Sequence, residues 1–367
     1  MTITSIEAIP FALPRRRPVR FSNGEVRQAE HVLVRVRADD GAVGVAEASP
    51  RAMTYGDTPR AVVDAFETTI GPLLIGADER HIEGVHAKLK YLVQNITARA
   101  ALDVALWDLK ARRAGVPVWE LLGGYARRVK VSHLLGLDTP QGMAEEAASM
   151  AREYGVKGFK VKVGVNLKDD VARTLAVREA VGDDAVIYLD ANHGWTAEDA
   201  LTAMKTLDRA QANVAWLEEP NPAAESVSRR WLVERLDVPV VADESAPDLQ
   251  RAASELRMGH VNWIAIKTGR TGFTFSRQIT DLCLAEGASV VTGSQIEGRL
   301  GSLANLHFTA AFGLPSRHPA ELTSGHGYSD DVVETLPIVD GWMEAPEKPG
   351  LGLEVDEARL NALRLDK

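Results

Sequence analysis

The amino-acid sequence predicts an α/β protein in which an α+β layer precedes a closed barrel of parallel β/α units. The first third of the chain reads as antiparallel strands followed by helices. From residue 129 onward, short apolar runs alternate with helical patterns, and seven or eight such units suit a barrel. An open doubly wound sheet is the structural alternative. Because no Gly-x-Gly-x-x-Gly follows the first strand, a dinucleotide site has no support.

The first third carries strand patterns and then helical ones. Residues 2–12 and 30–48 alternate apolar and polar side chains, which is typical of half-buried strands. Helical patterns follow over residues 59–70, 79–94 and 97–114. We expect Thr97 to cap the last of these helices and Gly115 to end it. These elements predict an antiparallel sheet covered by helices.

The middle of the chain repeats one strand and one helix many times. The apolar runs cover residues 129–136, 158–163, 185–190, 214–218, 238–242, 261–266, 288–292 and, more weakly, 320–323. The helical patterns cover residues 140–154, 168–181, 196–209, 225–236, 247–257, 271–286 and 299–312. Strands that alternate with helices form a parallel sheet whose two faces are both covered. The tail after residue 325 is rich in Pro and Gly, and residues 351–355 could pack back on the N-terminal layer.

Size, composition and charge restrict the possible functions. A chain of 367 residues suits two domains or one barrel with an attachment. Its net charge of −9 argues against nucleic acid or an anionic membrane as the main partner. The chain has no apolar stretch long enough to span a bilayer, and its start does not read as a signal peptide, so we expect a cytoplasmic protein. The single cysteine, Cys283, is expected to be a small buried hydrophobe.

Acidic residues end three successive predicted strands. Asp190, Glu218 and Asp243 lie at the carboxyl ends of their strands, where a β/α barrel places its active site. Three hard oxygen donors with open coordination positions suit Mg²⁺ or Mn²⁺, and no His or Cys cluster has zinc spacing. The acids could instead cap the following helices or lie at a solvated rim. Their register at three strands favours a metal site.

Lysines end two further strands. Lys160 and Lys162 are two residues apart, so on a strand they share one face and point into the barrel mouth. Each ammonium disfavours the charging of its neighbour, which lowers the pKa, but the carboxylates and the metal act in different directions, so no net shift follows from the sequence. Lys267 ends the sixth strand, across the barrel from the second. Snorkelling lysines would also give Lys-x-Lys. The third lysine favours an acid/base pair that reaches both faces of a bound carboxylate.

The ordered series of motifs resembles a known family. Lys-x-Lys, Asp-Ala-Asn, Glu-Glu-Pro, Asp-Glu-Ser and Ile-Lys-Thr follow one another at steps of 24 to 28 residues. With residues 101–110 and 121–124, this series resembles the enolase superfamily, and within it the muconate-lactonizing enzyme subgroup. The resemblance covers nearly the whole chain. It implies a modified (β/α)8-type barrel, (β/α)7β, over residues 126–324. It also implies an α+β capping domain over residues 1–125, completed by a C-terminal segment, 325–367, that packs back on it.

The resemblance also implies roles for the site residues. It implies a divalent metal, Mg²⁺ or Mn²⁺, held by Asp190, Glu218 and Asp243, and acid/base work by Lys162 and Lys267. Residues implied to support these groups are Lys160 as an electrostatic aid, and Asn192 and Glu244 as groups that orient the ligands. Family members commonly form homo-oligomers, dimers or octamers, which we expect here.

Metal and lysines are shared within the subgroup, so they do not choose the substrate. The subgroup includes muconate cycloisomerases, dipeptide epimerases, N-acylamino acid racemases and o-succinylbenzoate synthases. Dipeptide epimerases typically carry Asp-x-Asp on the last strand to hold the substrate ammonium, where this chain has Glu321 and Thr323. Loop residues 20–27 and 50–56 are expected to face the substrate. Residues 54–58 and 316–322 are similar to those of muconate cycloisomerases.

These features lead to a hypothesis for the reaction. A divalent cation with three lysines and three carboxylates leaves about two positive charges, ignoring screening, which suits the dianion cis,cis-muconate. The hypothesis is a muconate cycloisomerase that lactonizes muconate reversibly to muconolactone through an enolate, with either Lys162 or Lys267 as the acid. An N-acylamino acid racemase, a dipeptide or other epimerase, or an o-succinylbenzoate synthase is the alternative. Candidate contacts to the substrate are Arg51, Tyr55, Ser294, Gln295 and Glu321, although Arg51 could equally be a solvated surface residue.

Overall fold

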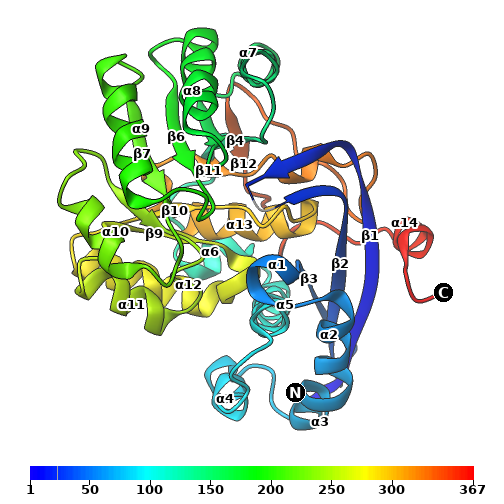
Figure 1. The fold of residues 1–367 in the computed structure, drawn as a ribbon. Helices are drawn as coiled ribbons and strands as arrows, with labels where there is room; N and C mark the ends of the chain where they lie inside the picture. Colours follow the sequence, from blue (N-terminus) through cyan, green and yellow to red (C-terminus); the bar gives the residue numbers. More distant parts are fainter. Residues whose placement is uncertain (23) are drawn as a thin grey trace.

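The N-terminal part of the computed structural model is a twisted antiparallel sheet (Figure 1). The structure describes residues 1–22 and 24–367, so Asn23 of the predicted loop 20–27 lies outside the described residues. The sheet has the order β1-β2-β3, with β1 Ile3–Phe21, β2 Gly24–Ala38 and β3 Val43–Ala48. The hairpin of β1 and β2 is longer than the sequence predicts. The pairing shifts register between Pro14 and Val19, which interrupts the alternation that would have indicated a continuous strand.

Several helices follow this sheet along the chain, and some of them pack against it. They are α1 Ala52–Tyr55, α2 Pro59–Asp64, the π-helical turn Ala65–Ile70, α3 Gly71–Leu74, α4 Ile82–Lys88, α5 Ile96–Ala114 and α6 Val118–Leu122. The prediction that Thr97 caps α5 is wrong, because the helix begins at Ile96 and Thr97 lies buried in its first turn. There the backbone N–H and hydroxyl of Thr97 both donate to Asp57, which supplies the cap from another loop. Gly115 ends α5 in the left-handed conformation, as predicted.

The second part is a nearly closed parallel barrel. Its strands are β4 Arg128–Leu135, β5 Gly158–Lys162, β6 Val186–Asp190, β7 Val214–Glu218, β8 Val240–Ala242, β9 Trp263–Ile266, β10 Ser289–Thr292 and β11 Ala320–Glu321. The helices between them are α7 Pro140–Tyr154, α8 Leu167–Val181, α9 Ala197–Arg209, α10 Ser226–Val233, α11 Leu249–Arg257, α12 Thr268–Ala285 and α13 Arg299–Ala311. The strand order runs from β10 down to β4 and then β11, so the (β/α)7β barrel is confirmed and the doubly wound sheet is excluded. Within the residues that the structure describes, β10 and β11 do not pair.

An aromatic layer fills the barrel beneath the predicted site. Tyr188, Trp216, Val241 and Ala265 face inward, each two residues before one of the predicted functional residues. The rings of Tyr188 and Trp216 stack with their centroids 4.1 Å apart. Because side chains on a strand alternate, burying this layer directs the residues two positions further on into the barrel mouth.

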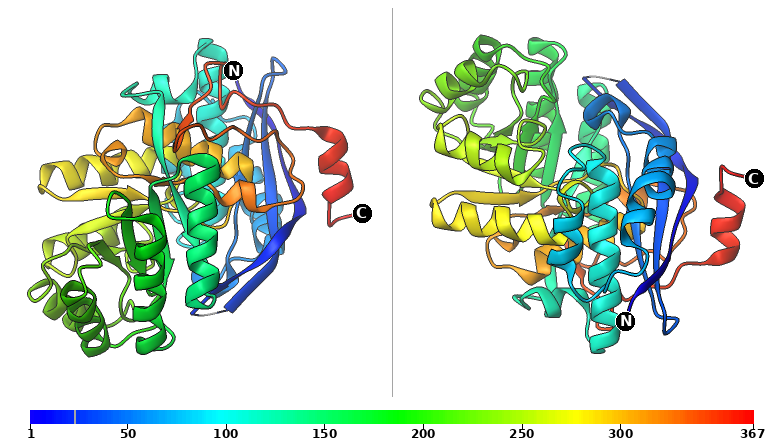
Figure 2. Two further views of the ribbon diagram at one scale, coloured as in Figure 1. Left: turned by 90° about the horizontal axis from the view of Figure 1, so that it is seen from above. Right: turned by 90° about the horizontal axis from the view of Figure 1, so that it is seen from below.

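The C-terminal segment contacts both parts of the fold. Strand β12, Trp342–Glu344, pairs antiparallel with β4 of the barrel, which the sequence did not indicate. Helix α14, Glu357–Leu363, lies against the outer face of β1, at the side of the sheet away from the barrel (Figure 2). The division into residues 1–125, 126–324 and 325–367 stays a prediction. In the described part of the chain, no helix combines the length and the apolar character that crossing a bilayer requires.

A buried histidine joins three segments and predicts a pH dependence of stability. His307 on α13 accepts the backbone N–H of Trp119 at its Nδ1 and donates from its Nε2 to the carbonyl oxygen of Leu351, so the ring must be neutral. Burial lowers the pKa of His307 to about 4, below the value of about 6.5 in an unfolded chain. The unfolded chain therefore binds a proton first, and stability falls as the pH drops from about 6.5 toward 4.

We expect this histidine to cost the wild type about 2 kcal/mol of unfolding free energy between pH 7 and pH 5. Unfolding measured at both pH values should show a smaller loss for His307→Gln, whose amide does not titrate. His81→Gln, at an exposed position, is the control. Equal losses in the wild type and His307→Gln would contradict the prediction.

Candidate active site at the barrel mouth

Three buried carboxylates meet at the ends of neighbouring strands. Asp190 and Glu218 end β6 and β7 in register, and Asp243 directly follows β8. One carboxylate oxygen from each lies within 4.8 Å of the others, and all three side chains are buried. Among the described residues, Oε2 of Glu218 has no hydrogen-bond partner. A buried cluster of three acids with an unpartnered oxygen fits a hard divalent cation.

The lysines lie against this acidic cluster. Nζ of Lys160 is 2.7 Å from Glu218 and 2.6 Å from Glu321, and Nζ of Lys162 is 2.6 Å from Asp190. Across the mouth, Nζ of Lys267 lies 2.5 Å from Oδ2 of Asp243. The lysines therefore converge with the acids at one end of the barrel, as their positions at strand ends predict.

The net shift in the pKa of Lys160, which the sequence left open, is upward. Burial does lower its pKa, but the carboxylates of Glu218, Glu321 and Asp190 outweigh burial and raise it well above the usual value. For Lys267, burial likewise lowers the pKa, and the neighbouring Asp243 raises it above its usual range. The sequence placed both the like charges and the acids at this end of the barrel, and the contact distances decide that the acids dominate.

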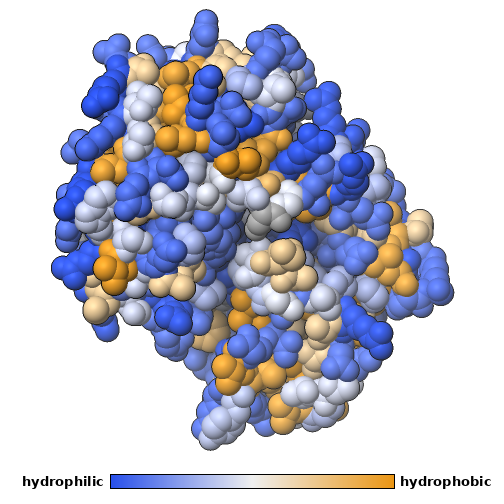
Figure 3. Space-filling view, viewed as in Figure 1, coloured by the Kyte–Doolittle hydropathy of each residue, from blue (hydrophilic) through white to orange (hydrophobic). Residues whose placement is uncertain are grey.

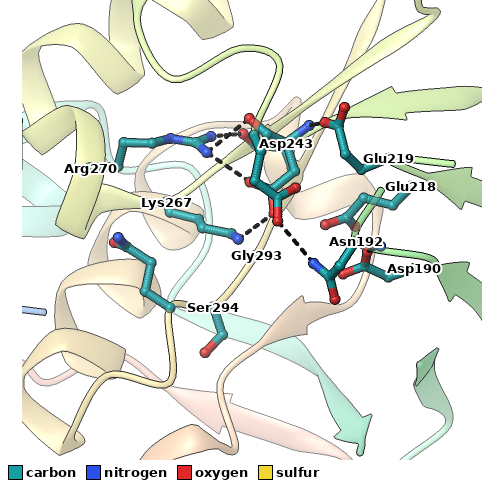
Figure 4. A network of polar contacts seen from close by, with 12 residues as sticks. Asp190, Asn192, Glu218, Glu219, Asp243, Lys267, Arg270, Gly293 and Ser294 are labelled. Carbon is teal, nitrogen blue, oxygen red and sulfur yellow. Dashed lines mark hydrogen bonds and ion pairs between the residues drawn. The ribbon is translucent and has the colours of Figure 1, made fainter. Parts of the chain in front are cut away.

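Two residues that the sequence analysis missed hold Asp243 in place. Oε2 of Glu219 accepts the backbone N–H of Asp243 at 2.6 Å and the backbone N–H and hydroxyl of Ser245. From the opposite side, Nη1 of Arg270 donates to Oδ1 and to the carbonyl oxygen of Asp243, at 2.7 and 2.9 Å (Figure 4). The doubled Glu-Glu of the motif was a signal for Glu219, since its two carboxylates serve different neighbours.

Asn192 and Glu244 connect the lysine to the rim of the site. Oδ1 of Asn192 accepts from Nζ of Lys162 at 2.6 Å, and its Nδ2 donates to Oε1 of Glu244 at 2.9 Å. Asn192 adopts φ 40°, in the left-handed region that asparagine tolerates better than most residues. Burial, reinforced by the charge of Asp243, raises the pKa of Glu244 to about 7.

A cavity of about 430 Å³ lies between the capping loops and the barrel mouth. In the space-filling view, hydrophilic and intermediate residues surround a recess on this face of the molecule (Figure 3). The barrel and the capping loops both supply lining residues, among them Lys162, Asn192, Glu244, Lys267, Ser294, Gln295, Phe21, Arg51, Met53 and Tyr55. Lys162 and Lys267, the predicted acid/base lysines, therefore face the same cavity.

The predicted substrate contacts are placed differently from one another. Tyr55, Ser294 and Gln295 line the cavity, and Nε2 of Gln295 has no partner among the described residues. Arg51 also lines the cavity, but its guanidinium donates to backbone carbonyl oxygens. Glu321 contacts Lys160 and is absent from the lining in the described part of the chain, so a direct contact with substrate has no support there.

Comparisons with known proteins agree with this geometry. The family model for the mandelate racemase / muconate lactonizing enzyme N-terminal domain matches residues 5–123, and the enolase C-terminal domain-like model matches residues 142–359. The crystal structure of a muconate lactonizing enzyme from Mycobacterium smegmatis, complexed with muconolactone, is 43% identical with a TM-score of 0.97 over all of both chains.

Two curated relatives with different activities are about equally similar. Muconate cycloisomerase 1-1 of Acinetobacter lwoffii is 32% identical over 100% of this chain and 97% of its own. The N-succinyl-L-Arg/Lys racemase of Bacillus cereus is 30% identical over 99% of this chain and 98% of its own. The chain therefore belongs to the muconate-lactonizing enzyme subgroup of the enolase superfamily, and it is an isomerase.

Proposed function

We propose that this protein is a muconate cycloisomerase, which interconverts cis,cis-muconate and muconolactone. Two lysines that face one cavity from opposite sides of an acidic cluster support acid/base chemistry at an enolate, which the whole subgroup shares. The observation that carries the choice of muconate is the 43% identity with the muconate lactonizing enzyme of Mycobacterium smegmatis over the whole of both chains.

The last barrel strand argues against a dipeptide substrate. A dipeptide brings an ammonium that needs a free carboxylate, but the carboxylate of Glu321 already pairs with Lys160 at 2.6 Å. The hydroxyl of Thr323 contacts Nδ1 of His133 at 2.9 Å. Because neither group is available to a cation, a substrate that carries only carboxylates suits this strand better.

The proposed chemistry assigns one task to each group. Asp190, Glu218 and Asp243 would hold Mg²⁺ or Mn²⁺, which when bound supplies Lewis-acid stabilisation of negative charge on a substrate carboxylate. Lys160, held by the carboxylates of Asp190 and Glu218, adds a positive charge beside them.

The bond changes then involve this chain's lysines. One carboxylate oxygen of muconate forms a bond to C4, and the electron pair of the attacked double bond moves toward the other carboxylate as an enolate. Lys162 or Lys267 donates a proton to the α-carbon of that enolate, which completes the lactone. The same lysine removes this proton in the reverse direction.

An N-succinylamino acid racemase is a second candidate. The Bacillus cereus relative favours it, and such a substrate has no free ammonium, so the pairing of Glu321 does not argue against it. In that reaction both lysines exchange a single α-proton from opposite faces.

The test mixes the protein with Mn²⁺ and cis,cis-muconate and follows the loss of diene absorbance. We expect loss with the wild type and formation of muconolactone. A parallel incubation of N-succinyl-L-arginine in D₂O detects racemization as deuterium at the α-carbon. No loss of diene together with rapid α-deuteration would replace the cycloisomerase by the racemase.

A further inference from the structure

A strained turn lines the substrate cavity. Ser294, Gln295 and Ile296 follow β10 and face the space above the acidic cluster. Ile296 has φ 57°, a left-handed conformation in which a β-branched side chain is crowded by its own backbone. Such a residue persists only where the surrounding structure holds it. The contacts around this turn therefore decide its shape.

Two side chains from distant segments hold the turn from outside. Nε of Arg51, in the loop after β3, donates to the carbonyl oxygen of Gln295 at 2.7 Å, and its Nη2 donates to that of Ile296 at 2.8 Å. The hydroxyl of Tyr328, in the C-terminal segment, donates to the same oxygen of Ile296 at 2.5 Å. A third N–H of Arg51, on Nη1, donates to Pro50. Most of the donors of Arg51 are thus engaged by backbone oxygens.

Buried groups hold the turn from inside. Oε2 of Glu297 accepts the N–H of Gln295 at 2.5 Å and the hydroxyl of Ser294 at 2.9 Å. Glu47 on β3 then accepts the N–H groups of Gly298 and Gly301 at the start of α13. Residues of the capping domain therefore hydrogen-bond both to the turn, through Arg51, and to the start of α13, through Glu47.

We propose that Arg51 is a positioning residue, which holds the Ser294–Ile296 turn in its strained conformation and so shapes the substrate cavity. Arg51 acts through Ser294 and Gln295, which face the substrate, and not by pairing with a substrate carboxylate. The effect of Arg51 on the turnover of cis,cis-muconate rests on the proposed function. The effect of Arg51 on the conformation of the turn does not depend on that function.

The first experiment measures amide hydrogen exchange of the substrate-free protein over residues 293–298. We compare the wild type with Arg51→Met and Tyr328→Phe, each of which removes donors to the turn. Losing a hydrogen bond of this kind makes local opening about 10-fold more frequent, so exchange should accelerate by about that factor in both variants. Arg60→Met, at an exposed arginine of α2, is the matched control and should exchange like the wild type.

Unchanged exchange in Arg51→Met would overturn the proposal. If Arg51→Met does not fold, Arg51→Lys decides in its place, because it keeps the charge and removes at least one of the two bonds from Arg51 to the turn. A variant Arg51→Lys, which keeps one donor, should fall between Arg51→Met and the wild type.

The second experiment measures kcat and KM with cis,cis-muconate. Displacement of the turn should raise KM by about 10-fold in Arg51→Met and to a smaller degree in Tyr328→Phe, with a smaller change in kcat. A raised KM in Arg51→Met with unchanged exchange would mean that Arg51 contacts the substrate, and would overturn the positioning role. If the wild type does not convert muconate, the proposed function fails, while the exchange experiment still decides the role of Arg51.

Discussion

Replacing the lysine that protonates the α-carbon, Lys162 or Lys267, with methionine should lower the turnover of cis,cis-muconate by about a thousandfold, and replacing the other lysine should lower it less. A general acid or base in the right place contributes about 10²- to 10⁴-fold to a rate. Methionine keeps an unbranched apolar stem in the barrel mouth and removes only the ammonium. Both lysines face the cavity, at Asp190 and Asp243 respectively, so neither can take over the position of the other.

The two variants should differ in their residual turnover of cis,cis-muconate. The lysine that donates the proton is essential to the α-carbon step, whereas its counterpart contributes charge on the other face. Turnover in D₂O places deuterium at the α-carbon, and the configuration of that carbon relative to C4 distinguishes syn from anti addition. The result identifies which of the two lysines faces the proton-accepting side. Product chirality is read by NMR.

Lys157→Met is the matched control for these variants. Lys157 is exposed and lies just before β5, at the end of the strand away from the site. We expect wild-type turnover from it. Full activity in both Lys162→Met and Lys267→Met, with an unchanged fold by circular dichroism, would contradict the acid/base role.

Glu218→Gln should abolish the stabilisation that a divalent cation gives to the wild type. Mn²⁺ at about 100 times its dissociation constant adds about 2.7 kcal/mol to the unfolding free energy of a protein that binds it only when folded. Removing one of three carboxylate ligands should weaken binding by at least about 100-fold, so the melting temperature of the variant should not respond to Mn²⁺. Turnover should fall by about a thousandfold, since several kcal/mol of charge stabilisation are lost.

In the absence of a divalent cation, Glu218→Gln should not lower the melting temperature. Oε2 of Glu218 has no partner among the described residues, and the side chain is buried beside two other acids. Replacing this carboxylate with a neutral amide removes like-charge repulsion, so the melting temperature in EDTA should stay equal to the wild type or rise.

Glu255→Gln is the control for a buried glutamate outside the cluster. Its carboxylate pairs with Arg229 at 2.8 Å, so this variant should lose stability equally with and without Mn²⁺. Calorimetric titration of Mn²⁺ measures affinity directly. An unchanged Mn²⁺ affinity in Glu218→Gln would remove Glu218 from the proposed ligand set.

Most of the barrel and the convergence of its charged residues could be predicted from the sequence. The alternation of apolar runs and helical patterns specified the order of strands, and a parallel barrel brings the carboxyl ends of its strands to one rim. Asp190, Glu218 and Lys267 were therefore placed together by their positions at strand ends, with no knowledge of contacts. Such inferences depend only on the alternation of side chains along each strand and on the order of neighbouring strands in the barrel.

The partners of those residues were decided by the tertiary structure. Glu321 was expected to face the substrate, but its carboxylate pairs with Lys160 from a strand far away in the chain. For Arg51 the sequence offered a contact with a carboxylate or a solvated position, and it gave no sign of the bonds that its guanidinium donates to the carbonyl oxygens of Gln295 and Ile296. Thr97 was expected to cap a helix, and it donates to Asp57. In each case the sequence established the position of a side chain along its own element. Which group it contacts depends on how separate elements pack, and a local pattern carries no information about that packing.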